Sequence, residues 1–197
     1  MKVFVFSDTH RDYKRLREIV EIEVNLFVCG GDLSNFGSGL EESGKILAPL
    51  GERLLVIPGN NETHADVLEL CKRHGFVDFH GQTHRIGKHV LAGLGYSPPT
   101  PFGTPGEMED SEFAKRLEAF AGLENLVLIT HGPPHGTELD RVWGGRHVGS
   151  KAIREFILRE RPLLNLSGHI HETEGVVTQL GSTECQNVGK RGRLLEL

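Results

Sequence analysis

The first 75 residues alternate three short apolar runs with three segments of helical periodicity, and this alternation most strongly constrains the fold. The apolar runs are rich in β-branched and aromatic residues, as is typical of buried strands. Strands that alternate with helices pair in parallel through right-handed crossovers, so an α/β fold with a parallel sheet is predicted. The predicted strands are residues 2–6, 26–29 and 54–57, and the predicted helices are 13–22, 40–50 and 65–74.

The pattern becomes more mixed after residue 75. Residues 76–94 contain turn signals at Gly81 and Gly87, which predicts antiparallel hairpin strands, and the four prolines of residues 96–106 predict a stiff surface loop. Further elements are predicted as a helix at 112–121, a strand at 126–129, a helix at 151–161, a strand at 163–166, and antiparallel strands around Gly181 and Gly189 within 175–197. We therefore expect two packed mixed sheets with helices on their outer faces.

The length of 197 residues suits one domain, residues 1–197, because one core of this size buries most of its apolar surface. The net charge of −5 argues against nucleic acid as a partner. The apolar run near the N-terminus is too short for a signal peptide or a membrane span, and the three cysteines form no CxxC pair. We therefore expect a cytoplasmic protein without a membrane partner, and a homo-oligomer is compatible with the sequence.

Polar residues of metal-ligand type directly follow each of the five predicted core strands. They are Asp8 and His10, Asp32, the run Asn60, Asn61 and Glu62, His131, and the pair His169 and His171. Ligands bind at the carboxyl ends of parallel strands, so these residues are predicted to share one site. The two i, i+2 pairs would point to one side on extended backbone. A single such pair is typical of a solvated loop, but five clusters at strand ends indicate a site.

In chain order these residues spell DxH, GGDxxN, GNNE, HG and GHxH, and from Asp8 to His171 the order resembles the calcineurin-like metallophosphoesterase superfamily. The resemblance implies a four-layer αββα sandwich of two mixed β-sheets flanked by helices, and a centre for two divalent metal ions. By position, Asp8, His10, Asp32 and His171 would hold the first ion, with Asp32 bridging, and Asn60, His131 and His169 would complete the second. Carboxylate, imidazole and amide ligands suit Mn, Fe, Zn or Co.

The implied activity is that of a metal-dependent phosphoesterase, either a phosphodiesterase or a phosphomonoesterase, acting on a small phosphoester or a nucleotide. Two ions roughly 3.5–4 Å apart activate a bridging water, so we expect hydroxide to attack the phosphorus. No protein nucleophile is then needed, and neither Ser7 nor Ser167 lies in the GxSxG turn of a serine hydrolase. Residues 39–45, GLEESGK, lack the Ser or Thr of a P-loop and lie in a predicted helix.

One departure from the family pattern affects catalysis. The family usually has a His after Asn60 that serves as general acid or steadies the transition state, and this chain has Asn61. An amide can hydrogen-bond to substrate but cannot deliver a proton. The candidate catalytic residues are therefore Asn60, Asn61 and His135, with His135 as a replacement acid. We expect nitrophenolate to leave far faster than an alkoxide. The alternative is a nucleotide- or metal-binding regulatory module with weak or no catalysis.

Four further residues lie near the predicted site loops. Asn35 stands where many relatives have Asp, and we expect it to hydrogen-bond to a ligand residue instead of binding metal. His64 is a second candidate for the missing acid, although it is also typical of a solvated first helical turn. Arg146 could pair with phosphate oxygens and His147 lies beside it, but both are also typical of a solvated loop.

Overall fold

A computed structural model describes all 197 residues and arranges eleven strands in two sheets. The first sheet, in the order β11-β1-β2-β3-β4, comprises β1 (Lys2–Phe6), β2 (Leu26–Cys29), β3 (Leu54–Val56), β4 (Val77–Asp78) and β11 (Arg193–Glu196). The second, in the order β5-β6-β7-β8-β10-β9, comprises β5 (Gln82–Ile86), β6 (His89–Leu94), β7 (Leu126–Thr130), β8 (Leu164–Ser167), β9 (Val177–Leu180) and β10 (Thr183–Asn187). Strands β1 to β4 are parallel, as the alternating pattern predicts.

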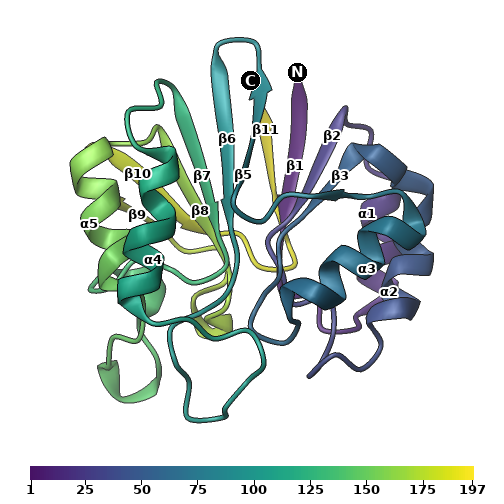
Figure 1. Cartoon of the computed structure of the whole chain (residues 1–197), viewed down its shortest axis with the longest axis horizontal. Helices are drawn as coiled ribbons and strands as arrows, with labels where there is room; N and C mark the ends of the chain where they lie inside the picture. The colour runs from purple at the N-terminus through teal and green to yellow at the C-terminus, as the bar shows by residue number, and fades with distance from the viewer.

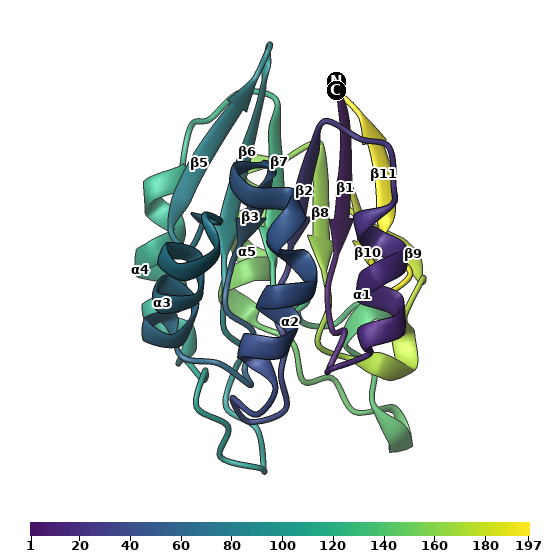
Figure 2. The same ribbon diagram turned by 90° about the vertical axis from the view of Figure 1, so that its right-hand side faces the viewer.

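Five α-helices cover the two outer faces and complete the predicted αββα layers (Figure 1). Helices α1 (Tyr13–Val20), α2 (Leu40–Leu47) and α3 (His64–His74) pack on the first sheet, and α4 (Asp110–Leu117) and α5 (Lys151–Glu160) pack on the second. Figure 2 shows α1, α2 and α3 side by side across their sheet. Short 3-10 turns follow at Ala48–Arg53, Glu118–Phe120, Glu138–Asp140, Trp143–Gly145 and His171–Thr173.

The alternation of side chains along β1 explains why its four residues after Lys2 are all apolar. Phe4 and Phe6 pack in the core between the first sheet and its helices, whereas Val3 and Val5 pack in the core between the two sheets. Successive strand residues point to opposite faces, and both faces of this sheet are covered. The continuous apolar run is therefore a consequence of the layered architecture.

Two turn predictions are confirmed and two need correction. Gly87 lies in the β5–β6 hairpin and Gly181 in the β9–β10 hairpin, as expected. By contrast, Gly81 lies between β4 and β5, and Gly189 between β10 and β11, which belong to different sheets. Strand β10 pairs in parallel with β8, and β11 is antiparallel to β1. A glycine marks where the chain turns, but long-range pairing decides which sheet the next strand joins.

The predicted helix at 40–50 is shorter in the structure. Helix α2 ends at Leu47 and continues as the 3-10 turn Ala48–Arg53, which contains Pro49. Proline has no backbone N–H to bond to the fourth preceding carbonyl, so the α-helix cannot continue through it. None of the five helices combines the length and the apolar character required to cross a bilayer.

Candidate active site

The loops after β1, β2, β3, β7 and β8 meet at one edge of the two sheets, opposite the edge where both termini lie (Figure 1). The first sheet supplies Asp8, His10, Asp32 and Asn60, and the second supplies His131, His169 and His171. His10 Nε2 lies 3.8 Å from Asp8 Oδ1, 3.4 Å from Asp32 Oδ2 and 3.0 Å from His171 Nε2. These four residues form the first of two groups.

The second group gathers around the side chain of Asn60. His131 Nε2 lies 3.0 Å from Asn60 Oδ1, and His169 Nδ1 lies 2.8 Å from the same oxygen. His131 Nε2 is also 3.6 Å from Asp32 Oδ2, so Asp32 is shared by the two groups. Two sets of three residues could each hold a metal ion, because within each set the possible ligand atoms all lie within 4.8 Å of one another. These sets are Asp8 with His10 and His171, and Asp8 with Asp32 and His131.

The two i, i+2 pairs do not lie on extended backbone, so the prediction that extended backbone points both side chains of a pair to one side is wrong. Asp8, His10 and His169 have φ values of 55°, 43° and 68°, and Asp32 has 56°. This left-handed conformation is uncommon for residues other than glycine and gathers at functional sites. His169 contacts Asn60, whereas His171 contacts His10 and lies 3.6 Å from Asp8 Oδ1, so the pair divides between the two groups.

Hydrogen bonds at the back of two imidazoles leave lone pairs that face the site. His10 Nδ1 lies 3.1 Å from the Ser34 carbonyl and 2.9 Å from Asn35 Oδ1, and His131 Nδ1 lies 2.9 Å from the Gly30 carbonyl. Both Nδ1 atoms face acceptors and so carry the proton, which leaves Nε2 as a lone pair in the neutral ring. These Nε2 atoms face oxygens that are acceptors as well. A cation bound between an Nε2 lone pair and these oxygens would interact favourably with both. This pattern is typical of metal-ligating histidine.

Charge balance in the site agrees with this donor set. Burial disfavours the imidazolium of His10, but the Asp8 and Asp32 carboxylates raise its pKa to about 9. For His169, burial and the neighbouring His131 lower the pKa to about 3, so its ring is neutral at physiological pH. The carboxylates therefore favour positive charge beside His10, and His169 offers a free lone pair. The residues fit divalent metal ions.

Asn61 lies behind the site and holds Asp32. Its backbone N–H donates to Asp32 Oδ1 at 2.9 Å and its side-chain Nδ2 donates to Asp32 Oδ2 at 2.7 Å. Its own Oδ1 accepts the Phe36 N–H at 2.9 Å, and the residue is buried. Asn35 makes the predicted hydrogen bond to His10, a candidate metal ligand.

Glu62 has a structural role that the sequence analysis missed. Its carboxylate accepts the N–H groups of Asp32 at 3.1 Å, Ser34 at 2.7 Å and Gly59 at 3.2 Å, which ties the loop after β2 to the loop after β3. Burial, followed by the nearby Asp32 charge, raises the pKa of Glu62 to about 7. Its position in GNNE was the only sequence signal, because burial of a carboxylate is not visible in sequence.

Two glycines, Gly59 and Gly168, lie directly against the carboxylates of Asp32 and Asp8. A Cβ on Gly59 would overlap the Asp32 carboxylate, and a Cβ on Gly168 would overlap that of Asp8. The Asp8 carboxylate also accepts the His169 N–H at 2.9 Å. Glycine therefore allows the strand-end loops to approach each other closely.

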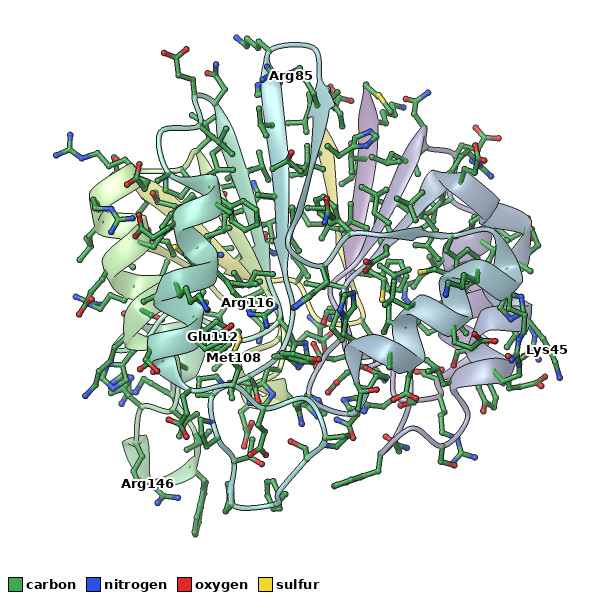
Figure 3. All side chains as sticks on the ribbon, viewed as in Figure 1. Lys45, Arg85, Met108, Glu112, Arg116 and Arg146 are labelled. Carbon is green, nitrogen blue, oxygen red and sulfur yellow. The ribbon has the colours of Figure 1, made fainter.

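Neither His135 nor His64, the candidates for the missing acid, forms a hydrogen bond or ion pair with the seven residues of the two groups. The His135 ring lies 5.8 Å from the ring of His147, and the His135 N–H donates to the Ser150 carbonyl. His64 Nε2 lies 3.0 Å from Asp78 Oδ2. Arg146 is exposed on the loop at the lower left of Figure 3, away from the strand ends.

A cavity of about 410 Å³ adjoins the first group. Asp8, His10 and His171 form one part of its wall, and Arg11 and Lys190 contribute cationic side chains to the rest. The cavity is large enough for a small phosphoester, since ligand pockets of roughly 300–1,000 Å³ accept drug-sized molecules.

Comparison with known proteins identifies the family. Residues 1–173 match the family described as calcineurin-like phosphoesterase. The chain is 34% identical over 195 residues to the uncharacterized protein MJ1162 of Methanocaldococcus jannaschii, covering 95% of this chain and 87% of that protein. The crystal structure of TT1561 of Thermus thermophilus has a TM-score of 0.69 at 16% identity, over 93% of this chain and 87% of that one. A dimetal phosphatase from Danio rerio has a TM-score of 0.58 at 12% identity, over 94% and 86%, and shows the shared fold. The chain belongs to the calcineurin-like phosphoesterase family.

Proposed function

We propose that the protein is a phosphoesterase that uses two divalent metal ions to hydrolyse a small phosphomonoester or phosphodiester. Family membership supports a phosphoesterase, and the observation that carries the metal dependence is the orientation of His10 and His131. The Nδ1 atom of each ring is tied to an acceptor, so that Nε2 turns its lone pair toward oxygens of Asp8, Asp32 or Asn60. Such an arrangement, with Nδ1 bound to a protein acceptor and Nε2 facing other ligand-type oxygens, is typical of metal-ligating histidine.

The distances support the following division of the ligands. Asp8, His10, Asp32 and His171 would hold the first ion, and Asp32, Asn60, His131 and His169 would hold the second. Mixed oxygen and imidazole ligands suit Mn, Fe, Zn or Co, whereas an all-thiolate site would favour softer ions.

The chain's own residues orient the reaction. When bound, two divalent ions supply a water that is nucleophilic at neutral pH and neutralise charge on the phosphoryl oxygens. Asn61 fixes both oxygens of Asp32, and the His169 N–H fixes Asp8, so the carboxylates are held before substrate binds. The Asn61 amide is not an acid and so delivers no proton to the leaving oxygen, and its Nδ2 is engaged with Asp32. We therefore expect efficient hydrolysis only where the leaving group departs without protonation.

The test is hydrolysis of bis(nitrophenyl) phosphate and nitrophenyl phosphate by chelator-treated protein after addition of Mn, Fe, Zn or Co. We expect turnover that depends on metal, and an Asp32→Ala variant should lose more than the roughly 10–100-fold typical of losing an outer hydrogen-bond partner. Glu124→Ala, which changes an exposed carboxylate, is the matched control and should retain activity. Equal rates on nitrophenyl and alkyl phosphates would contradict the lack of a general acid.

The engaged Asn61 amide also favours a second candidate function, a binding module with weak or no catalysis. The same four metals discriminate between the two functions. Tight nucleotide binding without turnover under every metal would identify the module, and metal-dependent turnover would exclude it.

A further inference from the structure

The cavity beside the metal-ligand residues contains one arginine and one lysine, and only the lysine is neutralised. Lys190 Nζ pairs with Asp12 Oδ2 at 3.0 Å. Arg11, which directly follows His10, has no carboxylate within ion-pair distance. Asp8, Asp12 and Glu174 also line the cavity, but none of them forms an ion pair with Arg11, so the cavity presents one guanidinium without a direct acidic partner.

Neighbouring residues hold this guanidinium in place. Arg11 Nε lies 3.3 Å from the Tyr13 hydroxyl and Nη1 lies 3.5 Å from Ser38 Oγ, so two of its N–H groups face hydroxyl oxygens and the others have no partner in the protein. Gly39, at φ 82°, leaves the room for this placement, because a Cβ there would lie 2.7 Å from Arg11 Cδ and Nε. Arg11 itself has the left-handed φ of 67°. Such strain at a non-glycine residue gathers at functional sites.

We propose that Arg11 binds a terminal oxygen of the phosphoryl group and makes the enzyme prefer dianionic phosphomonoesters over diesters. The inference rests on the proposed function, since it places the phosphoryl group at the adjoining ligands. The planar guanidinium fork matches a pair of phosphate oxygens. A monoester keeps three terminal oxygens and up to two negative charges, whereas a diester keeps two oxygens and one charge. A guanidinium in the wall without a direct acidic partner therefore favours the monoester.

Kinetics of the Arg11→Gln and Arg11→Lys variants test the preference. For Arg11→Gln we expect the KM for nitrophenyl phosphate to rise about tenfold, as loss of a charge-assisted hydrogen bond predicts. The KM for bis(nitrophenyl) phosphate and both kcat values should stay within about threefold. Arg11→Lys keeps the positive charge but lacks the planar guanidinium, so its KM for nitrophenyl phosphate should lie between those of the wild type and Arg11→Gln. Arg17→Gln, an exposed arginine of α1, is the matched control and should match the wild type.

Binding of inorganic phosphate to the manganese-loaded protein, measured by calorimetry, separates this inference from the proposed function. We expect Arg11→Gln to weaken phosphate binding about tenfold while bound manganese is unchanged. If the wild type hydrolyses neither substrate but Arg11→Gln still weakens phosphate binding about tenfold, the proposed function fails and the role of Arg11 in binding phosphate stands. Equal phosphate affinity in both proteins, equal losses on both substrates, or a parallel loss of manganese would overturn the inference.

Discussion

At the scale of single residues, the candidate metal ligands are held in place by hydrogen bonds from neighbouring residues. Asn61 donates to both oxygens of Asp32, and Glu62 accepts the Asp32 N–H. Asn35 fixes the ring of His10. These partners keep charged and strained residues in one arrangement, which reduces the cost of organising the site when an ion binds.

Replacing Asn61 with Ala should therefore weaken metal binding. Asp32 would lose the 2.7 Å hydrogen bond from Nδ2 but keep the one from the backbone N–H. Outer partners of this kind contribute about 10–100-fold to metal affinity. Calorimetric titration with manganese measures the change, and Asn25→Ala, which alters an exposed asparagine, serves as control. Unchanged affinity in Asn61→Ala would show that Asp32 needs no side-chain support.

The buried ring of His80 predicts a pH dependence of stability. Burial, followed by the positive charges of His64 and Arg116, lowers its pKa to about 4. Arg116 is anchored to Glu112 on α4 at 2.9 Å (Figure 3). The folded protein keeps His80 neutral while the unfolded chain takes up a proton near pH 6.5, so stability falls as pH drops from 6.5 to about 4.

This effect amounts to at most about 3–4 kcal/mol, since each pKa unit corresponds to about 1.4 kcal/mol. His80→Asn keeps an acceptor for the Gly95 N–H but does not titrate. Urea unfolding at several pH values should show the variant's deficit in unfolding free energy shrinking between pH 6.5 and 4. A deficit that is constant over this range would mean that His80 titrates alike in both states.

At the scale of elements, the loop between β7 and α5 is organised around one buried carboxylate. Asp140 accepts hydrogen bonds from the N–H groups of Gly136, Thr137 and Gly149 and from His147 Nδ1, at 2.7–3.0 Å. From the sequence we singled out His135, Arg146 and His147 in this loop, and not this carboxylate. A fully buried acid with four donors is a folding determinant of the segment.

Asp140→Asn should therefore destabilise the protein by about 2 kcal/mol at neutral pH, because the amide places a donor among donors. Burial raises the pKa of Asp140, but hydrogen bonds from His147, Gly149 and Gly136 outweigh it and lower the pKa below 3.8. The stabilisation is present above pH 3.8 and is lost as pH falls through the lowered pKa. The free energies of unfolding of variant and wild type should therefore differ at pH 7 and become similar in acid, as chemical denaturation at both pH values would show. A difference that persists in strong acid would contradict this prediction.

At the scale of the whole molecule, the candidate ligand residues come from both sheets. Asp8 and Asp32 follow strands of the first sheet, and His131, His169 and His171 follow strands of the second. Ions held as proposed would join the two halves of the sandwich at their shared edge. Metal binding would then stabilise the folded state as a whole, since the unfolded chain does not preserve the site.

Metal removal should accordingly lower the Tm. An ion at one hundred times its Kd adds about 2.7 kcal/mol, and each kcal/mol shifts the Tm of a chain of this size by about 2–4 °C, so a drop of about 5–10 °C is expected on chelation. Scanning calorimetry with and without chelator measures it. His131→Asn should remove most of the metal-dependent shift, and His84→Asn, a half-exposed histidine of β5, should preserve it. A chelator-insensitive Tm in the wild type would count against tight metal binding.

The amino-acid sequence by itself determined the local features of this protein. Apolar runs such as residues 2–6 and 54–57 predict strands because their periodicity and β-branched content are local properties. Parallel pairing of β1 to β3 follows from the helices between them. Since parallel strands end at one edge, the ligand-type residues after each strand were predicted to meet, and the structure brings the seven together.

Only the tertiary structure decided which side chain meets which. The sequence could not place β11 beside β1 or β10 beside β8, because these pairs depend on contacts between distant segments. Residue spacing alone could not divide His169 from His171, which only the family resemblance assigned to different ions, because His169 lies on left-handed backbone. Nor could it turn the side chain of Asn61 toward Asp32, because that contact joins the loops after β2 and β3. Residue types and strand order are encoded locally, whereas orientation and burial of the site residues arise when two sheets pack into one edge.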